Sequence, residues 1–341
     1  MHNKDLLPIA QPAARAWLAI FIFGAWLLGL LCFAAQIFVP IPYGDLTRIG
    51  RVSEKLFGWM SIQPNIQESN RKNYPLDSAD VLVVGDSFSM PMAWQSVLQK
   101  KGLRVHTTTW DRVTGVCADF PAWLANNGFN GRFVIFESIE RYFANRLVRS
   151  LQCGATKPQI LPMTATKLVQ PNFWLDLGGS SPFDAYEIWN RTKRVKDAKA
   201  SIILTNPPGN RSMLVSAIKV SSGCTQFSHN FCNAALFLNE DFTTPILTKG
   251  DASTMSQISN VIHSAKVIWM IIPNKYTVYV DPSRGDEFPR ALNDLHLGPD
   301  LFRAAQTDRW QIKDLYWPND THWSTIGQVH FGRIVLNWIE R

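Results

Sequence analysis

The clearest pattern along the chain is an alternation of short apolar runs with longer amphipathic stretches, which begins at residue 80. The runs Val81–Val84, Arg104–Trp110, Phe133–Phe136 and Val267–Ile272 have the length and β-branched or aromatic content of buried strands. Helical spacing separates and follows them, over residues 91–101, 120–127, a stretch ending at Arg149, 253–265, 288–305 and a C-terminal helix capped by Ser324. Strands that alternate with helices predict an α/β domain whose mostly parallel sheet has helices on both faces, in three αβα layers.

A different pattern precedes this domain. Ala16–Ala35 contains no charged residue, and it is long enough to cross a bilayer. A helix of a soluble domain is seldom apolar on every side, and we find no small-x-small cleavage site, so we predict an uncleaved transmembrane anchor over 16–39. Residues 1–15 are expected in the cytoplasm, although basic residues flank the anchor on both sides. Residues 40–78 are polar and proline-rich, and they predict a linker with one short helix near 53–60.

The domain expected over residues 79–341 contains an insertion at 150–250, where the alternation stops and prolines accumulate. We expect it to form a small subdomain or a lid with some strand, for example at Ser201–Leu204. Its basic run, Arg191–Lys199, is most simply a solvated helix face, and glycan binding is the alternative.

Composition narrows the choice of partners. The net charge is +7, which favours an anionic partner such as an acidic glycan, lipid head groups or nucleic acid. No basic run carries interleaved aromatics and no cysteine–histidine spacing resembles a zinc site, so we expect neither a nucleic-acid partner nor a metal or other cofactor. The 13 tryptophans suit a core, a membrane interface or sugar stacking.

Four cysteines follow the anchor. Cys224 and Cys232 are close enough in sequence to bridge a loop, which leaves Cys117 to pair with Cys153. Such disulfides would place the domain in an oxidising compartment, whereas four unpaired and partly buried thiols are the alternative.

The candidate chemistry lies at the end of the first strand. Gly85-Asp86-Ser87 is placed at the carboxyl edge of the expected sheet, where α/β domains hold reactive groups. A serine nucleophile needs a base that an acid orients, and Asp320 and His322, just before the last helix, are the best candidate pair. The helix after Ser87 would aim its N–H groups at an oxyanion. Ordinary helix capping explains either motif alone.

Together the two motifs carry a resemblance. Gly85-Asp-Ser-Phe-Ser with Asp320-Thr-His-Trp-Ser resembles the SGNH (GDSL-like) hydrolase superfamily, and more narrowly the alginate O-acetyltransferase-like proteins of the AlgX/AlgJ group. The segments FVIFESIERYF (133–143) and IIPNKYTVY (271–279) are similar to further blocks of that group. Two features differ: the serine block precedes the histidine block here, and the Gly-x-Asn-Asp block that supplies an oxyanion asparagine is missing.

The resemblance implies roles for further residues. The N–H of Gly115 would join that of Ser87 in the oxyanion hole. Glu137 and Arg141 would lie near the site and contact substrate, or else form an ion pair that fixes the loop. Trp323 would pack against the histidine or stack on a sugar, and packing is the better interpretation. Lys275 would be structural or line the rim.

The implied function is that of a single-pass protein of the bacterial inner membrane with its catalytic domain in the periplasm. Ser87 would carry an acyl group, most simply acetyl, to an exported polysaccharide, and a membrane-bound O-acyltransferase would be the donor partner. A carbohydrate esterase with the same triad, and a non-catalytic scaffold of an envelope polysaccharide complex, are the alternatives.

Overall fold

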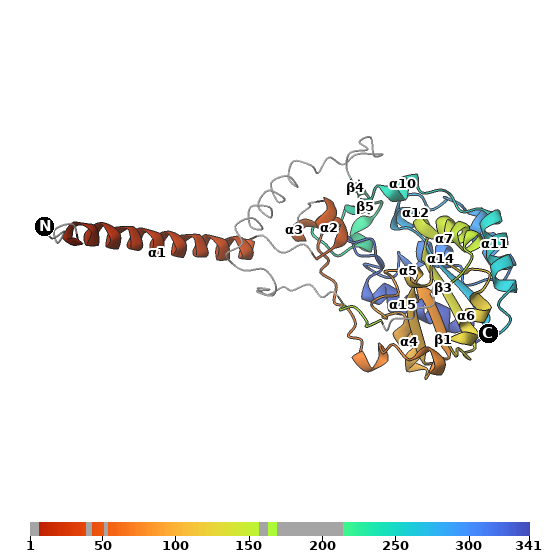
Figure 1. Cartoon of the computed structure of the whole chain (residues 1–341). Coiled ribbons are helices and arrows are strands. Elements are labelled where there is room, and N and C mark those ends of the chain that lie inside the picture. The colour runs from red at the N-terminus through yellow and green to blue at the C-terminus, as the bar shows by residue number, and fades with distance from the viewer. Residues whose placement is uncertain (1–6, 39–42, 51–53, 157–162, 169–213) are drawn as a thin grey trace.

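The computed structural model of the chain (Figure 1) describes residues 7–38, 43–50, 54–156, 163–168 and 214–341. Its centre is a four-stranded sheet in the order β2-β1-β3-β6, in which all three neighbouring pairs are parallel. The strands are β1 (Val81–Gly85), β2 (Val105–Thr109), β3 (Phe133–Ile139) and β6 (Lys266–Ile272). The predicted α/β class and parallel sheet are therefore confirmed.

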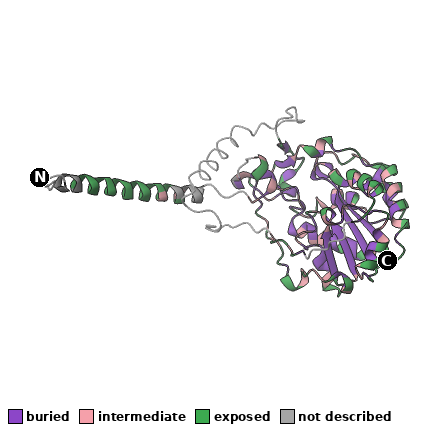
Figure 2. Cartoon of the chain, in the orientation of Figure 1, coloured by how far each residue is buried: buried purple, intermediate pink, exposed green. Residues whose placement is uncertain are grey.

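Both faces of this sheet are covered. Alternate residues of β1 enter two separate apolar clusters, Val81 and Val83 in one and Leu82 and Val84 in the other, which is why the strand is apolar at every position. Figure 2 shows the strands as the buried centre of the molecule. The first cluster includes residues of α4 (Gln95–Lys100), α12 (Lys275–Tyr279), α14 (Leu301–Asp308) and α15 (Thr325–Ile339). The second includes residues of α5 (Trp110–Val113), α6 (Phe120–Asn126), α7 (Glu140–Gln152), α11 (Lys249–Asn260) and α13 (Glu287–Asp294).

Two predicted helices differ from the structure. The helix expected over 288–305 is divided into α13 and α14, because the chain between them runs beside β6, where the Trp269 N–H donates to Leu297 O at 2.8 Å. A Cβ at Gly298 would lie 1.9 Å from Trp269 O, so this close approach requires glycine. The helix expected from residue 91 begins only at Gln95, after a series of turns.

The N-terminal helix α1 (Leu7–Phe38) contains one segment, Pro12–Leu31, that is long and apolar enough to cross a membrane, and none of it is buried. Figure 1 shows α1 standing apart from the sheet and its helices, and Figure 2 colours most of its described residues as exposed. An apolar segment that is not buried against the described part of the chain is what a membrane anchor or a signal sequence would present.

The stretch predicted to be a linker contains ordered structure. We call residues 43–50 and 54–60 the N-terminal segment; it holds α2 (Asp45–Gly50) and α3 (Glu54–Phe57), the latter within the predicted helix. Leu46 and Phe57 are fully buried in a small apolar cluster with residues of β4 and β5. Two 3₁₀ turns, at Glu68–Asn70 and Leu76–Ser78, follow. This part of the chain thus packs on the domain as well as connecting to it.

The described part of the insertion contains an antiparallel pair, β4 (Val215–Lys219) and β5 (Ala234–Leu238). The short helices α9 (Gly223–Gln226) and α10 (Glu240–Thr243) accompany it. The predicted basic helix face at 191–199 and the strand at 201–204 lie outside the described residues. Disulfides join Cys117 to Cys153 and Cys224 to Cys232, as expected from the spacing.

Candidate active site

The turn after β1 is built around a glycine. A Cβ at Gly85 would lie 2.4 Å from Ser89 Oγ and 2.7 Å from Glu137 Oε2, so no larger residue fits at this position. Glu137, at the carboxyl end of the neighbouring strand β3, accepts from the Asp86 N–H at 2.8 Å and from Ser89 Oγ at 2.6 Å. Two strand ends are thereby joined below Ser87, which remains exposed.

Asp86 fixes the same turn from its other side. Its carboxylate accepts from the N–H groups of Phe88 at 3.1 Å and Ile139 at 2.9 Å, and it pairs with Arg146 of α7 at 2.8 Å. Burial opposes the charge of Asp86, but Arg146 and these hydrogen bonds hold its pKa below the ordinary value. Burial, together with the charge of Asp86, raises the pKa of Glu137 well above its ordinary range. The pKa values of the two carboxyl groups are therefore displaced in opposite directions, and Asp86 ionises more readily than Glu137.

The loop before α15 brings His322 to Ser87. Ser87 Oγ lies 2.7 Å from His322 Nε2, and His322 Nδ1 lies 2.6 Å from Asp320 Oδ1. The His322 N–H also donates to Asp320 Oδ1 at 2.9 Å, so the acid is held by backbone and ring alike. The imidazole packs against Phe88, with 4.7 Å between ring centroids. These contacts join a hydroxyl, an imidazole and a carboxylate in the order in which a serine triad holds its nucleophile, base and acid.

A second carboxylate, from the N-terminal segment, lies at the same histidine. Asp45 Oδ2 is 3.6 Å from His322 Nδ1, and the Asp45 N–H donates to Asp320 Oδ2 at 2.9 Å. The facing ligand atoms of Asp45, Asp320 and His322 lie within 4.8 Å of one another, which would also suit a metal ion. Each of these side chains is already hydrogen-bonded within the protein, to Thr321 or to one another, so we treat them as a hydrogen-bonded network.

Burial and the neighbouring charges shift the pKa values of His322, Asp320 and Asp45. Burial opposes the protonation of His322, but Asp320 and Asp45 outweigh it and raise its pKa to about 9. Burial likewise opposes the ionisation of Asp320, yet His322 and the hydrogen bonds lower its pKa to about 2. Burial, and then the charge of Asp320, raise the pKa of Asp45 to about 6. A reaction that uses neutral His322 as a base is therefore expected to speed up as the pH rises towards about 9.

Lys275 and Trp323, which the family resemblance also singles out, are both buried beside the loop that carries His322. Lys275 Nζ donates to the carbonyls of Leu236, Trp317, Pro318 and Asp320, at 2.6 to 3.3 Å. Burial lowers the pKa of Lys275 to about 7. Trp323 is fully buried and stacks on Phe331, with ring centroids 4.1 Å apart. Lys275 is therefore a structural residue, and Trp323 packs in the core and cannot stack on a sugar.

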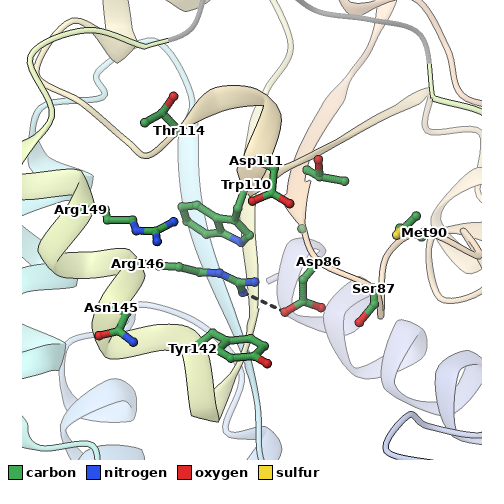
Figure 3. A pocket seen from close by; sticks show the side chains of 12 residues that line it. Asp86, Ser87, Met90, Trp110, Asp111, Thr114, Tyr142, Asn145, Arg146 and Arg149 are labelled. Carbon is green, nitrogen blue, oxygen red and sulfur yellow. Dashed lines mark hydrogen bonds and ion pairs between the residues drawn. The ribbon is translucent and has the colours of Figure 1, made fainter. Parts of the chain in front are cut away.

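Ser87 lies at the edge of a cleft of about 640 Å³ (Figure 3). One helix, α7, supplies much of its lining, and Figure 3 shows Arg146 pointing to Asp86 from that side. The polar residues of the lining besides Asp86 and Ser87 are Thr109, Asp111, Thr114, Tyr142, Asn145, Arg146 and Arg149. A cleft of this size, with mixed polar and apolar lining, can hold a small organic ligand beside Ser87.

Three other residues predicted for the site, Glu137, Arg141 and Gly115, do not line the cleft. Glu137 is fully buried below the turn, so it supports Ser87 and does not face a substrate. Arg141 forms an ion pair with Asp241 at 3.1 Å and not with Glu137, and its side chain is 7% exposed, so it has a structural contact but not the ion pair that was expected. Gly115 lies against Ser150 and Cys153, while its neighbour Thr114 lines the cleft. Since α4 begins eight residues after Ser87, it does not aim its first N–H groups there.

Three residues of the site, Asp45, Asn145 and Arg146, were not predicted from the sequence. Asp45 stands in a polar stretch without periodicity, and nothing local connects it to His322. Arg146 and Asn145 lie in an amphipathic helix, where polar positions usually face solvent. Asn145 and Arg146 lie three or four residues from Tyr142 and Arg149, and this spacing places the four side chains along one face of α7. The spacing was the sequence feature that could have indicated a shared site.

Comparisons of this chain with protein-family models, with curated proteins and with solved structures found no match.

Proposed function

We propose that this chain is a membrane-anchored serine O-acyltransferase with an SGNH-like three-layer domain, which transfers an acyl group, most simply acetyl, to an exported polysaccharide. The observation that carries the proposal is the relay from Ser87 Oγ through His322 to Asp320, with distances of 2.7 and 2.6 Å. An exposed serine so paired, at the carboxyl edge of a parallel sheet, has the arrangement of an activated nucleophile.

The reaction has two balanced steps. Ser87 Oγ attacks the carbonyl carbon of the donor, His322 Nε2 takes the hydroxyl proton, and the donor's leaving group departs with that proton. A sugar hydroxyl then attacks the Ser87 ester, gives its proton to His322, and leaves as the acylated sugar while Ser87 regains its hydrogen. Asp320 stays ionised and stabilises the imidazolium in both steps. The N–H of Ser87 is the proposed oxyanion donor, and the family resemblance adds that of Gly115, which follows the cleft residue Thr114. The amide of Asn145 is a further candidate within the cleft.

The proposed location and partners are supported by features outside the cleft. The apolar helix α1 would anchor the protein in the bacterial inner membrane, and the two disulfides favour a periplasmic domain. The family resemblance supplies the donor partner, a membrane-bound O-acyltransferase. The net charge of +7 suits an acidic acceptor.

A carbohydrate esterase is the second candidate, because Ser87 is exposed and water can reach it. A non-catalytic scaffold is less favoured, since it would not need the short contacts around Ser87.

The test uses the full chain in detergent, treated with an aryl acetate and examined by intact mass. We expect one acetyl group on Ser87, none in Ser87→Ala, and wild-type behaviour in the control Ser283→Ala, which removes another exposed serine. An oligosaccharide is then added: acetylated sugar indicates a transferase, and free acetate alone an esterase. Unchanged acetylation of Ser87→Ala would refute both enzyme proposals.

A further inference from the structure

The N-terminal segment makes contact with three consecutive residues of the loop that carries the histidine. The Asp45 N–H donates to Asp320 Oδ2 at 2.9 Å. The Asp45 carboxylate accepts from the Thr321 N–H at 2.8 Å and from its hydroxyl at 2.5 Å. The remaining contact is the 3.6 Å approach of Asp45 Oδ2 to His322 Nδ1. No residue of the first strand or of α15 takes part in these bonds, which join positions 275 and 276 residues apart.

Backbone hydrogen bonds also join the N-terminal segment to the histidine loop. The N–H groups of Leu46 and Thr47 donate to Asn319 O at 3.1 and 3.3 Å, and Asn319 Nδ2 donates to Glu54 Oε2 at 2.7 Å. A Cβ at Gly44 would lie 2.2 Å from Asn319 O, so the approach of the two chains depends on glycine there. The segment is thus fitted against the loop along its length.

We propose that Asp45 is a positioning residue for acyl transfer: it holds the Asp320–Thr321–His322 turn and adds a second negative charge that favours the imidazolium formed when His322 takes the Ser87 proton. This inference rests on the proposed function. Asp45 acts through His322 and Asp320 and touches neither donor nor acceptor.

Several charged groups surround His322, and each has its own effect on how readily the imidazole is protonated. Asp320 belongs to the same turn, Lys275 reaches it from α12, Glu54 lies behind it on α3, and Arg141 acts from α7. Arg141 is a cation and disfavours a positive charge on His322. Asp45 and Asp320 are the two carboxylates whose charges favour protonation of His322. Removing one of them should therefore lower the proton affinity of the imidazole measurably.

Chain length adds a consequence for location. Asp45 follows the last residue of α1, Phe38, by only seven positions, and a chain spans at most about 3.6 Å per residue, or about 25 Å here. With α1 as the anchor, a residue that touches the triad stays within about 25 Å of the end of the membrane helix. The acyl site would be held close to the membrane, where an integral-membrane donor would present its acyl group.

The test is the pH dependence of kcat/KM for an aryl acetate, measured with the full chain in detergent. Asp45→Asn keeps the shape and an acceptor for the Thr321 N–H but removes the charge. We expect the acid limb of the profile to move to lower pH by about one unit, as the loss of a nearby opposite charge requires. The plateau should fall by less than about tenfold, because a base weaker by one pKa unit loses only part of that factor in rate. Asp45→Glu, which keeps the charge, should retain the wild-type limb even where its rate is lower.

A matched control is available at the far end of α14. Asp308 pairs with His330 at 2.6 Å, so Asp308→Asn makes the same chemical change beside a histidine outside the site, and it should leave the profile unchanged. The proposal would be overturned if the acid limb of the kcat/KM profile of Asp45→Asn lay at the same pH as that of the wild type, whatever its rate. It would also be overturned if Asp45→Asn and Asp45→Glu lost the same amount of activity and neither shifted the limb. Full activity of Ser87→Ala would instead overturn the proposed function itself.

Discussion

The ion pair between Arg141 and Asp241 offers a direct test of whether Arg141 serves the fold or the substrate. The two side chains are 7% and 1% exposed, with Arg141 Nη1 3.1 Å from Asp241 Oδ1. We consider Arg141→Met, which keeps an apolar stem and leaves Asp241 buried without its cation. Removing one partner of a buried pair is costly because the other charge remains in a medium that cannot solvate it.

The magnitude depends on pH. Burial raises the pKa of Asp241 to about 6 even though Arg141 lowers it. Because this native pKa lies above the unfolded value, the native carboxyl holds its proton below pH 6, and there the cation matters least. Without Arg141 the native pKa rises further, so above pH 6 the variant loses about 1.4 kcal/mol of stability per pH unit relative to the wild type. At pH 8 this amounts to about 3 kcal/mol.

The assay is denaturant unfolding of the full chain in detergent, followed by tryptophan fluorescence at pH 5.5 and pH 8. We expect the destabilisation by Arg141→Met to be larger at pH 8 by about 3 kcal/mol, and the double variant Arg141→Met/Asp241→Asn to lose this pH dependence. The double variant should still form the Ser87 acyl-enzyme. An equal cost at both pH values would refute the electrostatic reasoning, and a well-folded double variant that cannot bind glycan would show that Arg141 contacts substrate.

Two further changes test the supports of the site. Replacing Cys117 and Cys153 together by alanine opens a loop of 36 residues, and loop-closure entropy predicts a loss of about 4 kcal/mol in unfolding free energy; an unchanged melting temperature would contradict this. Lys275→Met leaves several buried carbonyls without a donor, so we expect at least about 2 kcal/mol of lost stability and a lower kcat, while Lys249→Met, at an exposed lysine, should do neither. Equal stability of these two lysine variants would show that the ammonium does not hold the histidine loop.

Local pattern was sufficient for much of the fold. Four runs of β-branched and aromatic residues became the four strands of a parallel sheet, because strands covered on both faces are apolar throughout. The helix over 288–305 was wrong because amphipathic spacing continues across Gly298 and Pro299, where contact with β6 decides the path of the chain.

For the site, the sequence by itself determined the candidates: a serine at a strand end, and an acid and a histidine two residues apart in one loop. Spacing alone explains why Asp320 can reach His322, since both belong to the same turn. Tertiary structure alone decided that Glu137 is buried beneath Ser87, that Arg141 is paired with Asp241, and that Asp45 lies against the histidine loop. Periodicity is a property of neighbouring residues, whereas these contacts join strand ends and segments brought together by the packing of the whole domain, so no local window contains them.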